Sequence, residues 1–391
     1  MCFAISPFLH SLFFLFLSCV LVAPLAPAQA KGKRHRSVVA PPAIPAQSTL
    51  QVVSAILYDM DAERILFEQN ADQRIQPASL TKVLSMFVAM DHVKRGHARL
   101  GSVVPVSENA ATTGGSVMGI RQNDTVTLEQ LLMGMAVSSG NDASAAVAEY
   151  VGGSEASFIR MMNAKAASLG MANSNFRTPH GLPEPGQYTS ARDMLTLARA
   201  YLRAYPQNLR YHNTRVLNHQ NRISWNRNPL LMQYEGADGL KTGWVRASGF
   251  NLISTAKRNN RRLLAVVLGA HDAGNRGVET CRLLDAGFQV LAGNAPSVAD
   301  ALENLDRSGY AALDIHRTAQ EARALYPTAH EAKPLGRPSR LMAGGKRGKA
   351  GKAKGRSGKR QVRQKAKQTP KSRHTARNKR QQRTADVQSG G

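Results

Sequence analysis

The sequence predicts an α+β fold of mixed helix and strand layers, in which a cluster of helices packs on an antiparallel sheet. The first observation is size and composition: the chain has 391 residues, of which 42% are hydrophobic, enough for a sizeable core. The second is order: strand-like apolar segments lie near both ends of residues 49–293, with helix-like segments between them. Because strands from both ends of this region can pair with one another, we expect a single sheet.

The first part of this region predicts a hairpin and then a series of helices. Val52–Asp59 and Arg64–Glu68 are strand-like and are separated by a short polar turn. A helix begins at about Ala78, with Pro77 at its entrance, and its apolar residues recur every three or four positions. The same spacing predicts four more helices: Leu128–Met135, Asp142–Tyr150, Ser157–Leu169 and Ala191–Tyr205.

The last part returns to strands and ends in a helix. Gly249–Thr255 and Leu263–Leu268 are continuous apolar runs joined by a polar turn, as in strands of a buried sheet. Glu279–Leu291 predicts the closing helix. The segment Asp238–Trp244, just before the first of these strands, fits either a sheet edge or a hairpin turn.

The N-terminus resembles an export signal. Leu12–Ala26 is apolar but shorter than the roughly 20 residues that span a membrane, and Ala28 and Ala30 fit a cleavage site. Residues 1–30 are therefore predicted to be a signal peptide. No lysine or arginine precedes the apolar run, so an uncleaved N-terminal anchor is an alternative. A lipid anchor at Cys19 is a weaker one, because this residue lies within the run. Each alternative predicts an exported protein, in the periplasm or at the cell-envelope surface.

Charge is concentrated at the other end of the chain. The net charge is +26, yet residues 341–391 alone hold 17 basic residues and one acidic residue, and residues 37–340 keep a net charge of +6. We therefore expect no dedicated nucleic-acid site in the folded part of the chain. Residues 344–391 predict a disordered basic tail that either binds polyanions, such as wall carboxylates, anionic lipid headgroups or lipopolysaccharide phosphates, or has no function.

Two linkers flank the predicted folded region. Residues 31–48 are basic and proline-rich. Residues 294–343 predict a partly helical linker, with helices near Ala299–Leu305 and Ala319–Leu325.

Cysteine and histidine usage argues against metal and redox chemistry. Of the three cysteines, only Cys281 lies outside the predicted signal, which excludes a disulfide framework and a cysteine-based metal site within one mature chain. We find no His-Glu-x-x-His motif, phosphate-binding loop or dinucleotide fingerprint. The sequence thus predicts no metal and no cofactor. His180 and His271 could suggest a serine–histidine–aspartate triad, but lone loop histidines are more often structural.

The first of three short motifs pairs a hydroxyl with an amine. In Ser79-Leu80-Thr81-Lys82 the serine and the lysine are three residues apart, so on a helix they share a face. A serine hydroxyl is a weak nucleophile until a base removes its proton, and a desolvated lysine near a second cation can supply a neutral amine. A lone copy of this pattern also fits a surface serine and a surface lysine.

The other two motifs would be unremarkable singly. Ser139-Gly140-Asn141 presents a hydroxyl and an amide from one turn between predicted helices, and alone it fits a helix cap. In the third motif, Lys241 and Thr242 on a sheet edge can bind a carboxylate, while Gly243 leaves room for a ligand backbone to run alongside. Alone, that motif fits a hairpin turn with a solvated lysine.

Taken in order, S-x-x-K, S-x-N and K-T-G resemble the signature of the active-serine penicillin-recognising enzymes. The chain is most similar to the low-molecular-mass penicillin-binding proteins, the serine-type D-alanyl-D-alanine carboxypeptidases of peptidase family S11. The similarity covers about Leu50–Leu291 and implies a serine transpeptidase/β-lactamase-like fold, which makes residues 49–293 the catalytic DD-peptidase domain. The segments that carry it are Pro77–Lys82, Thr178–Pro183, Thr189–Met194, Ser139–Ala143 and Asp238–Gly243.

The resemblance implies a mechanism on peptidoglycan stem peptides. Ser79 would attack the carbonyl between the last two D-alanines and form an acyl-enzyme, with Lys82 as the base. Ser139 would pass the proton to the departing D-alanine amine, while Asn141 would orient the base and hold the substrate amide. The same serine should react with β-lactams, which makes them inhibitors.

The resemblance also implies that the third motif binds the substrate. Lys241 and Thr242 would bind the terminal carboxylate, beside Gly243. The backbone N–H groups of Ser79 and Trp244 would hold the oxyanion. Many relatives have histidine at the last position, so we expect Trp244 to alter substrate fit more than catalysis.

Three other functions stay open. Shorter relatives act as DD-endopeptidases that cut peptidoglycan crosslinks, and we expect this chain, like them, to lack the family's β-rich second domain and amphipathic anchor. A class A β-lactamase would have Ser-Asp-Asn as its second motif and a catalytic glutamate in a loop, whereas Glu184 lies in a proline-rich loop typical of the carboxypeptidases. A non-catalytic basic wall-binding protein would require a broken motif.

Overall fold

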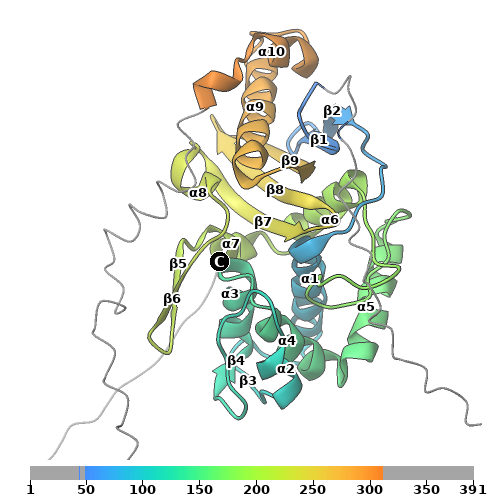
Figure 1. Ribbon diagram of the computed structural model, residues 1–391, viewed down its shortest axis with the longest axis vertical. Helices are drawn as coiled ribbons and strands as arrows, with labels where there is room; N and C mark the ends of the chain where they lie inside the picture. Colours follow the sequence, from blue (N-terminus) through green and yellow to red (C-terminus); the bar gives the residue numbers. More distant parts are fainter. Residues whose placement is uncertain (1–43, 45–48, 311–391) are drawn as a thin grey trace, which may run out of the picture. The chain divides into compact units, whose positions relative to one another are not determined.

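A five-stranded antiparallel sheet lies at the centre of the domain, in the order β2-β1-β9-β8-β7 (Figure 1). The computed structural model describes residue 44 and residues 49–310. The sheet combines strands from both ends of this segment, so the prediction of one antiparallel sheet is confirmed. Its strands are β1 (Ser54–Asp59), β2 (Arg64–Gln69), β7 (Ala237–Val245), β8 (Gly249–Arg258) and β9 (Arg261–Ala270).

The predicted helices form within a few residues of their expected bounds. The 3₁₀ turn η1 (Ala78–Leu80) leads directly into the first of them. These helices are α1 (Thr81–Lys94), α3 (Leu128–Val137), α4 (Asn141–Gly152), α5 (Glu155–Ser168) and α6 (Ala191–Ala204).

Several short elements were not predicted. Each has two to five residues, too few to show a periodic pattern or to be stable without tertiary packing. They are two two-stranded antiparallel sheets, β3 (Val103–Val104) with β4 (Val126–Thr127) and β5 (Val216–His219) with β6 (Arg222–Trp225), together with α2 (Glu108–Thr112), η2 (Pro206–Asn208), α7 (Leu209–Asn213) and α8 (Leu230–Gln233).

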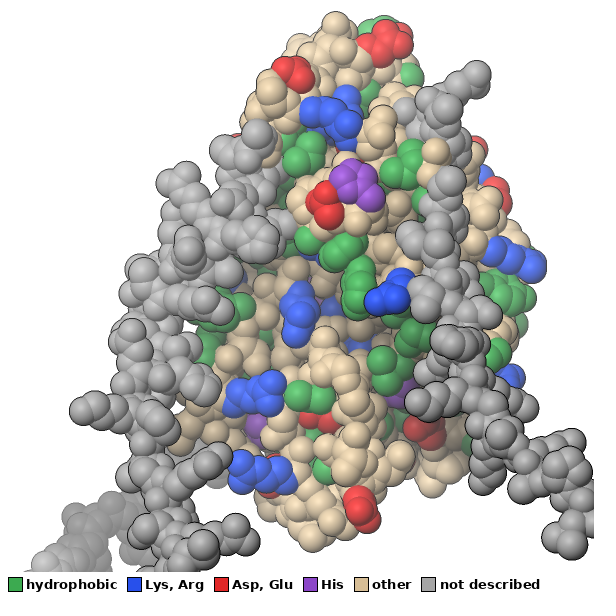
Figure 2. Space-filling model, in the orientation of Figure 1, with side chains coloured by type: hydrophobic (Ala, Val, Ile, Leu, Met, Phe, Trp, Pro, Cys, Tyr) green, Lys and Arg blue, Asp and Glu red, His purple; other side chains and the backbone are tan. Residues whose placement is uncertain are grey.

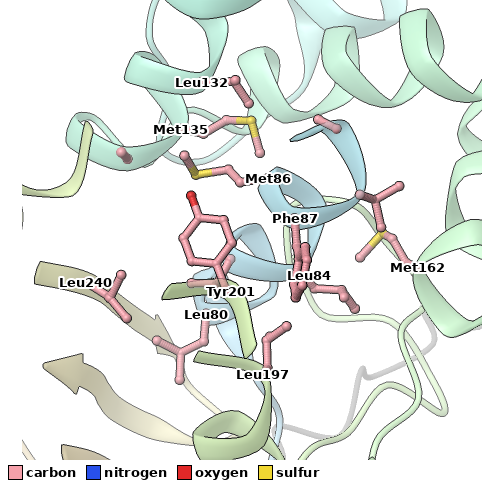
Figure 3. Close-up of a cluster of buried hydrophobic side chains, with 14 of the residues drawn as sticks. Leu80, Leu84, Met86, Phe87, Leu132, Met135, Met162, Leu197, Tyr201 and Leu240 are labelled. Carbon is pink, nitrogen blue, oxygen red and sulfur yellow. The ribbon is translucent and has the colours of Figure 1, made fainter. Parts of the chain in front are cut away.

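One hydrophobic core joins the helical cluster to the sheet. Figure 3 shows Leu80, Phe87 and Tyr201 pointing toward one another between the helices and the sheet. Leu240 of β7 belongs to the same cluster. Leu80 directly follows Ser79 in the chain, and Leu240 directly precedes Lys241. The core therefore anchors both chain segments that carry the first and third motifs.

A second core covers the opposite face of the sheet. It packs α9 (Ala273–Leu291) and α10 (Val298–Asn304) against the sheet. Successive residues of β8 and β9 point alternately into the two cores, as Leu252 and Ile253 do. This double burial explains the continuous apolar runs in the sequence.

The helix α9 begins six residues before the predicted Glu279. Asp272 caps it by accepting a hydrogen bond from the Asn275 backbone N–H. The polar and glycine residues of its first two turns concealed this start.

The packed part of the chain continues to Tyr310. Arg282 of α9 donates hydrogen bonds to the carbonyls of Leu302 and Leu305, and a short 3₁₀ turn, η3 (Arg307–Tyr310), follows. The helix expected near Ala299–Leu305 is therefore α10, packed on the domain. The expected helix at Ala319–Leu325, the signal peptide, the basic tail and, apart from Ile44, the first linker lie outside the described residues. None of the helices within residues 49–310 has the length and apolar character needed to span a membrane.

Candidate active site

The three motifs meet where the start of α1 lies beside the end of β7 (Figure 1). Ser79 sits in η1 and is half-buried. The preceding Ala78 has φ 49°, a left-handed conformation that is unusual for a residue with a side chain, and the Thr81 hydroxyl donates to its carbonyl at 2.8 Å. This sharp turn places Ser79 on a cavity of about 420 Å³ that Asn141 and Trp244 also line.

Lys82 is completely buried one turn after the serine. Its Nζ lies 3.0 Å from Ser79 Oγ, 2.7 Å from Asn141 Oδ1 and 2.7 Å from the His180 carbonyl oxygen. A neutral amine has two N–H donors and one lone pair. The two carbonyl oxygens can accept both N–H groups, which leaves the lone pair for the hydroxyl proton of Ser79.

Burial and nearby cations favour this neutral form. Burial lowers the pKa of Lys82 well below 10.5, and the charges of Lys241 and Arg227 lower it further, while Asp142 opposes them. Lys241 is also buried, and its pKa falls to about 7 because of burial and the charges of Arg227 and Arg276. The site is therefore a cluster of cations with one lysine held next to the serine.

The second motif forms the turn between α3 and α4. Asn141 is buried, and its Nδ2 donates to the Gly114 carbonyl at 2.7 Å, which fixes the amide oxygen toward Lys82. The next residue, Asp142, accepts backbone N–H bonds from Met118 and Gly119 and so holds the neighbouring loop.

Ser139 lies in the same turn but makes no hydrogen bond with Ser79 or Lys82. It is buried in a left-handed conformation with φ 59°. Its hydroxyl has no hydrogen-bond partner among residues 49–310, so the structure does not join it directly to Ser79 or Lys82.

The third motif lies on β7, an edge strand, and not in a turn. Lys241 and Thr242 are both buried, and Lys241 Nζ donates to the Thr242 carbonyl at 3.0 Å. A Cβ on Gly243 would lie 3.1 Å from Ala78 Cβ and 3.2 Å from the Ser79 nitrogen. The glycine thus lets the strand pass directly against the turn that carries the serine, a contact within the chain that the sequence did not indicate. Trp244 is 56% exposed at the cavity.

Two arginines in the site were missed by the sequence analysis. Arg227 lines the cavity, and its Nε donates to the Ser138 carbonyl at 3.3 Å. Arg276 of α9 is buried with its pKa lowered to about 10 by burial, and its Nε has no hydrogen-bond partner in the described part of the chain. No signal in the sequence pointed to Arg276, because the predicted helix began at Glu279, three residues after it.

The two histidines do not form a triad with Ser79. His180 contributes its backbone carbonyl to Lys82, while its ring accepts a hydrogen bond from the Leu182 N–H. Burial and the charge of Lys82 lower the pKa of this ring to about 3, so the ring is neutral. His271 is exposed and pairs with Asp272. In residues 49–310, no three histidine, cysteine or acidic side chains gather closely enough to hold a metal.

Comparison with known proteins identifies the family to which this chain belongs. Residues 40–272 match the family described as D-alanyl-D-alanine carboxypeptidase, peptidase S11. The chain belongs to this family. The D-alanyl-D-alanine carboxypeptidase DacF of Bacillus subtilis is 35% identical over 271 residues, which are 68% of this chain and 67% of that protein.

Solved structures of penicillin-binding proteins share the fold. Penicillin binding protein 6B from Escherichia coli superposes with a TM-score of 0.60 and 35% identity, over 64% of this chain and 81% of that one. Penicillin-Binding Protein D2 from Listeria monocytogenes, in its ampicillin-bound form, superposes with a TM-score of 0.57 and 27% sequence identity. The superposition covers 61% of this chain and 98% of that one. The predicted family and fold are therefore confirmed, as is the prediction of a serine-type D-alanyl-D-alanine carboxypeptidase of cell-wall metabolism.

Proposed function

We propose that this S11 carboxypeptidase removes the terminal D-alanine of peptidoglycan stem peptides through an acyl-enzyme on Ser79. The observation that carries this assignment is the 3.0 Å approach of the buried Lys82 amine to the Ser79 hydroxyl, at the wall of an open cavity. A lysine with a lowered pKa is a competent general base at moderate pH.

The first step joins Ser79 to the substrate. Neutral Lys82 takes the hydroxyl proton as Oγ attacks the carbonyl carbon of the penultimate D-alanine, and the carbonyl electrons move to oxygen. The backbone N–H groups of Ser79 and Trp244 stabilise the resulting oxyanion. Support for this pair comes from Gly243, whose missing side chain lets β7 reach the turn that holds Ser79.

The second step releases D-alanine. The bond from carbon to nitrogen breaks, and the proton held by Lys82 reaches the leaving amine through Ser139. Asn141 keeps the lysine in place through its 2.7 Å contact and holds the substrate amide. Water then hydrolyses the ester, which regenerates the Ser79 hydroxyl and frees the shortened peptide.

A group of cations selects a free C-terminus. Lys241 and Thr242 bind the terminal carboxylate, and Arg276 contributes to the positive potential there. Three facts support this role: both lysine and arginine are buried, the Arg276 Nε is unpartnered within residues 49–310, and the charge of Arg276 acts on Lys241. A carboxylate would compensate the cost of burying these charges.

β-Lactams would use the same serine. Their strained amide would place its carbonyl over Ser79 and its carboxylate at the cation group. The ampicillin-bound form of the Listeria monocytogenes relative supports this assignment.

The chain is also proposed to work outside the cytoplasm. Its relatives are bacterial cell-wall enzymes, and the signal-like N-terminus fits export to the periplasm or envelope surface. The basic tail, residues 344–391, would hold the enzyme near polyanions of the envelope through salt-sensitive contacts.

Mass spectrometry of muropeptides tests the reaction itself. The purified enzyme is incubated with monomeric pentapeptides and with crosslinked dimers. The expected result is a loss of one D-alanine from the pentapeptides. Splitting of dimers without release of D-alanine would instead assign the DD-endopeptidase reaction, and no change in either substrate would refute both.

A further inference from the structure

The cavity beside Ser79 carries more than one positive charge in its lining. Its lining includes two arginines, Arg227 and Arg246, and no acidic residue. On the face shown in Figure 2, basic side chains (blue) are spread over the domain, and some of them lie in its central part. A substrate that fills this cavity is therefore expected to carry negative charge in more than one place.

Arg227 belongs to the catalytic end of the cavity. Its charge lowers the pKa of both Lys82 and Lys241, so it lies within electrostatic reach of both amines. Together with Arg276, it completes the cation group assigned to the terminal carboxylate.

Arg246 also lines the cavity, from the turn that follows β7. It follows the last residue of β7, is exposed, and has no hydrogen bond or ion pair among the described residues. The extended chain from Lys241 to Val245, four residues, covers roughly 13 Å before the turn that carries Arg246. Its charge is therefore free to meet a ligand.

The open edge of β7 sets the direction of the bound peptide. Because β7 is the last strand of the sheet, an extended substrate can add to it as an antiparallel strand. With the terminal carboxylate at Lys241 and Thr242, the residue two positions earlier in the peptide lies about 7 Å along the strand, level with Trp244.

Trp244, near the end of β7, and Arg246, in the turn that follows the strand, both line the cavity. Both residues are exposed, whereas Val245 between them is buried. Trp244 packs against Phe250 with ring centroids 5.8 Å apart, which gives a supported apolar surface next to a free guanidinium. This pair matches a side chain with methylene groups that ends in a carboxylate.

We propose that Arg246 is a specificity-determining residue that binds a carboxylate on the side chain of the third stem-peptide residue. The enzyme would then prefer stems with a diamino diacid such as diaminopimelate at this position over stems whose side chain ends in an amide or an amine. This inference rests on the proposed carboxypeptidase function, since it assumes that the stem peptide occupies the cavity.

The test compares two synthetic pentapeptides that differ in one group. Both have the sequence L-Ala-γ-D-Glu-X-D-Ala-D-Ala, where X is meso-diaminopimelate with either a free or an amidated side-chain carboxyl. For the full-length enzyme we expect kcat/KM, measured by D-alanine release, to be about fivefold higher for the free acid, the effect of one exposed ion pair. Arg246→Gln should bring this ratio close to one, and Arg246→Glu should reverse it.

Two controls isolate the contact. Arg64→Gln removes an exposed arginine from β2, the opposite edge of the same sheet, and should leave the ratio unchanged. The same pair of peptides is also made with D-isoglutamine in place of D-glutamate. The ratio of their kcat/KM values should depend on Arg246 in the same way. If the preference for the free acid disappears in the D-isoglutamine pair, the contact belongs to the glutamate carboxylate and the proposal is overturned.

The outcomes also separate this proposal from the reaction on which it rests. If the wild-type enzyme cleaves both peptides equally, or if Arg246→Gln keeps the preference, the assignment of Arg246 is wrong and the carboxypeptidase function stands. If the wild-type enzyme releases D-alanine from neither peptide, the proposed function fails and the specificity proposal with it.

Discussion

Lys82 Nζ lies 3.0 Å from Ser79 Oγ, with the amine fully buried and the serine at the cavity wall. The helical spacing of three residues brings the two groups together, but burial and neighbouring cations give the amine its lowered pKa. The reactivity of the pair therefore depends on tertiary packing as much as on the motif.

Replacing the nucleophile should abolish covalent labelling by penicillin. We expect fluorescent penicillin to label residues 31–391 of the wild-type protein and not Ser79→Ala, since no other hydroxyl in the described structure forms a hydrogen bond with the Lys82 amine. Gel fluorescence after denaturation measures the ester. Ser168→Ala, an exposed serine on α5, is the matched control and should be labelled fully. Labelling of the Ser79 variant would place the nucleophile elsewhere.

Activity should show a bell-shaped dependence on pH. kcat/KM should rise as Lys82 loses its proton, at a pH below the 10.5 of an ordinary lysine. It should fall again as Lys241 loses its charge, with a pKa of about 7 in the free enzyme, because a neutral amine binds a carboxylate weakly. Lys241→Arg should move the alkaline limb upward, since a guanidinium stays charged. An unchanged alkaline limb in this variant would contradict the role of Lys241.

Removing the buried charge of Lys241 should lower activity without lowering stability. Lys241→Met keeps the length of the side chain but loses the charge, so kcat/KM should fall at least about 100-fold as a charged hydrogen bond to substrate is lost. The folded pKa of Lys241 lies below its unfolded value, so charge burial is fully destabilising below about pH 7 and disappears above about pH 10.5.

The melting temperature of the Lys241→Met variant at pH 6 should therefore equal or exceed that of the wild type. Differential scanning fluorimetry measures it, and Lys257→Met, on the exposed part of β8, is the matched control. A parallel loss of activity and melting temperature would show that Lys241 holds the fold and not the substrate.

Gly243→Ala should reduce activity by displacing the serine. The new Cβ would lie 3.1 Å from Ala78 Cβ and 3.2 Å from the Ser79 nitrogen, so the turn must shift by a few tenths of an ångström. We expect a loss of 10- to 100-fold in the rate of penicillin acylation, roughly the sensitivity of catalysis to small misplacements.

Gly277→Ala in α9 is the opposite case. No atom lies within 4 Å of its added Cβ, so we expect stabilisation of about 0.5–1 kcal/mol from helix propensity and an unchanged acylation rate. Equal acylation rates for the two alanine variants would refute the packing role of Gly243.

The basic tail should control retention on the envelope and not catalysis. Residues 344–391 carry most of the excess positive charge. We expect a protein that ends at residue 343 to cleave the pentapeptide as efficiently as the protein with the tail, but to lose low-salt cosedimentation with envelope fragments. For the protein with the tail, cosedimentation should fall steeply as salt rises, as for polyanion contacts in general. Equal cosedimentation of the two proteins would leave no role for the tail in binding.

Much of the fold was predictable from local patterns. The apolar runs of β8 and β9 and the periodic residues of α1 and α6 appear where expected, because burial on a sheet or a helix face repeats along the chain. Short elements such as β5 and α8 could not be predicted from local patterns, because their stability comes from neighbours that are distant in sequence. The ambiguity at Asp238–Trp244 was resolved only by its pairing with β8.

For the site, the sequence by itself determined which functional groups are present and that Ser79 and Lys82 are neighbours, since a separation of three residues on a helix is a local property. Only the tertiary structure decided that Lys241 is buried with a pKa of about 7, that Arg227 and Arg276 add their charges, and that Arg246 lines the same cavity as Ser79. Desolvation and Coulomb interactions act through space, so they depend on which distant segments pack together and not on their order along the chain.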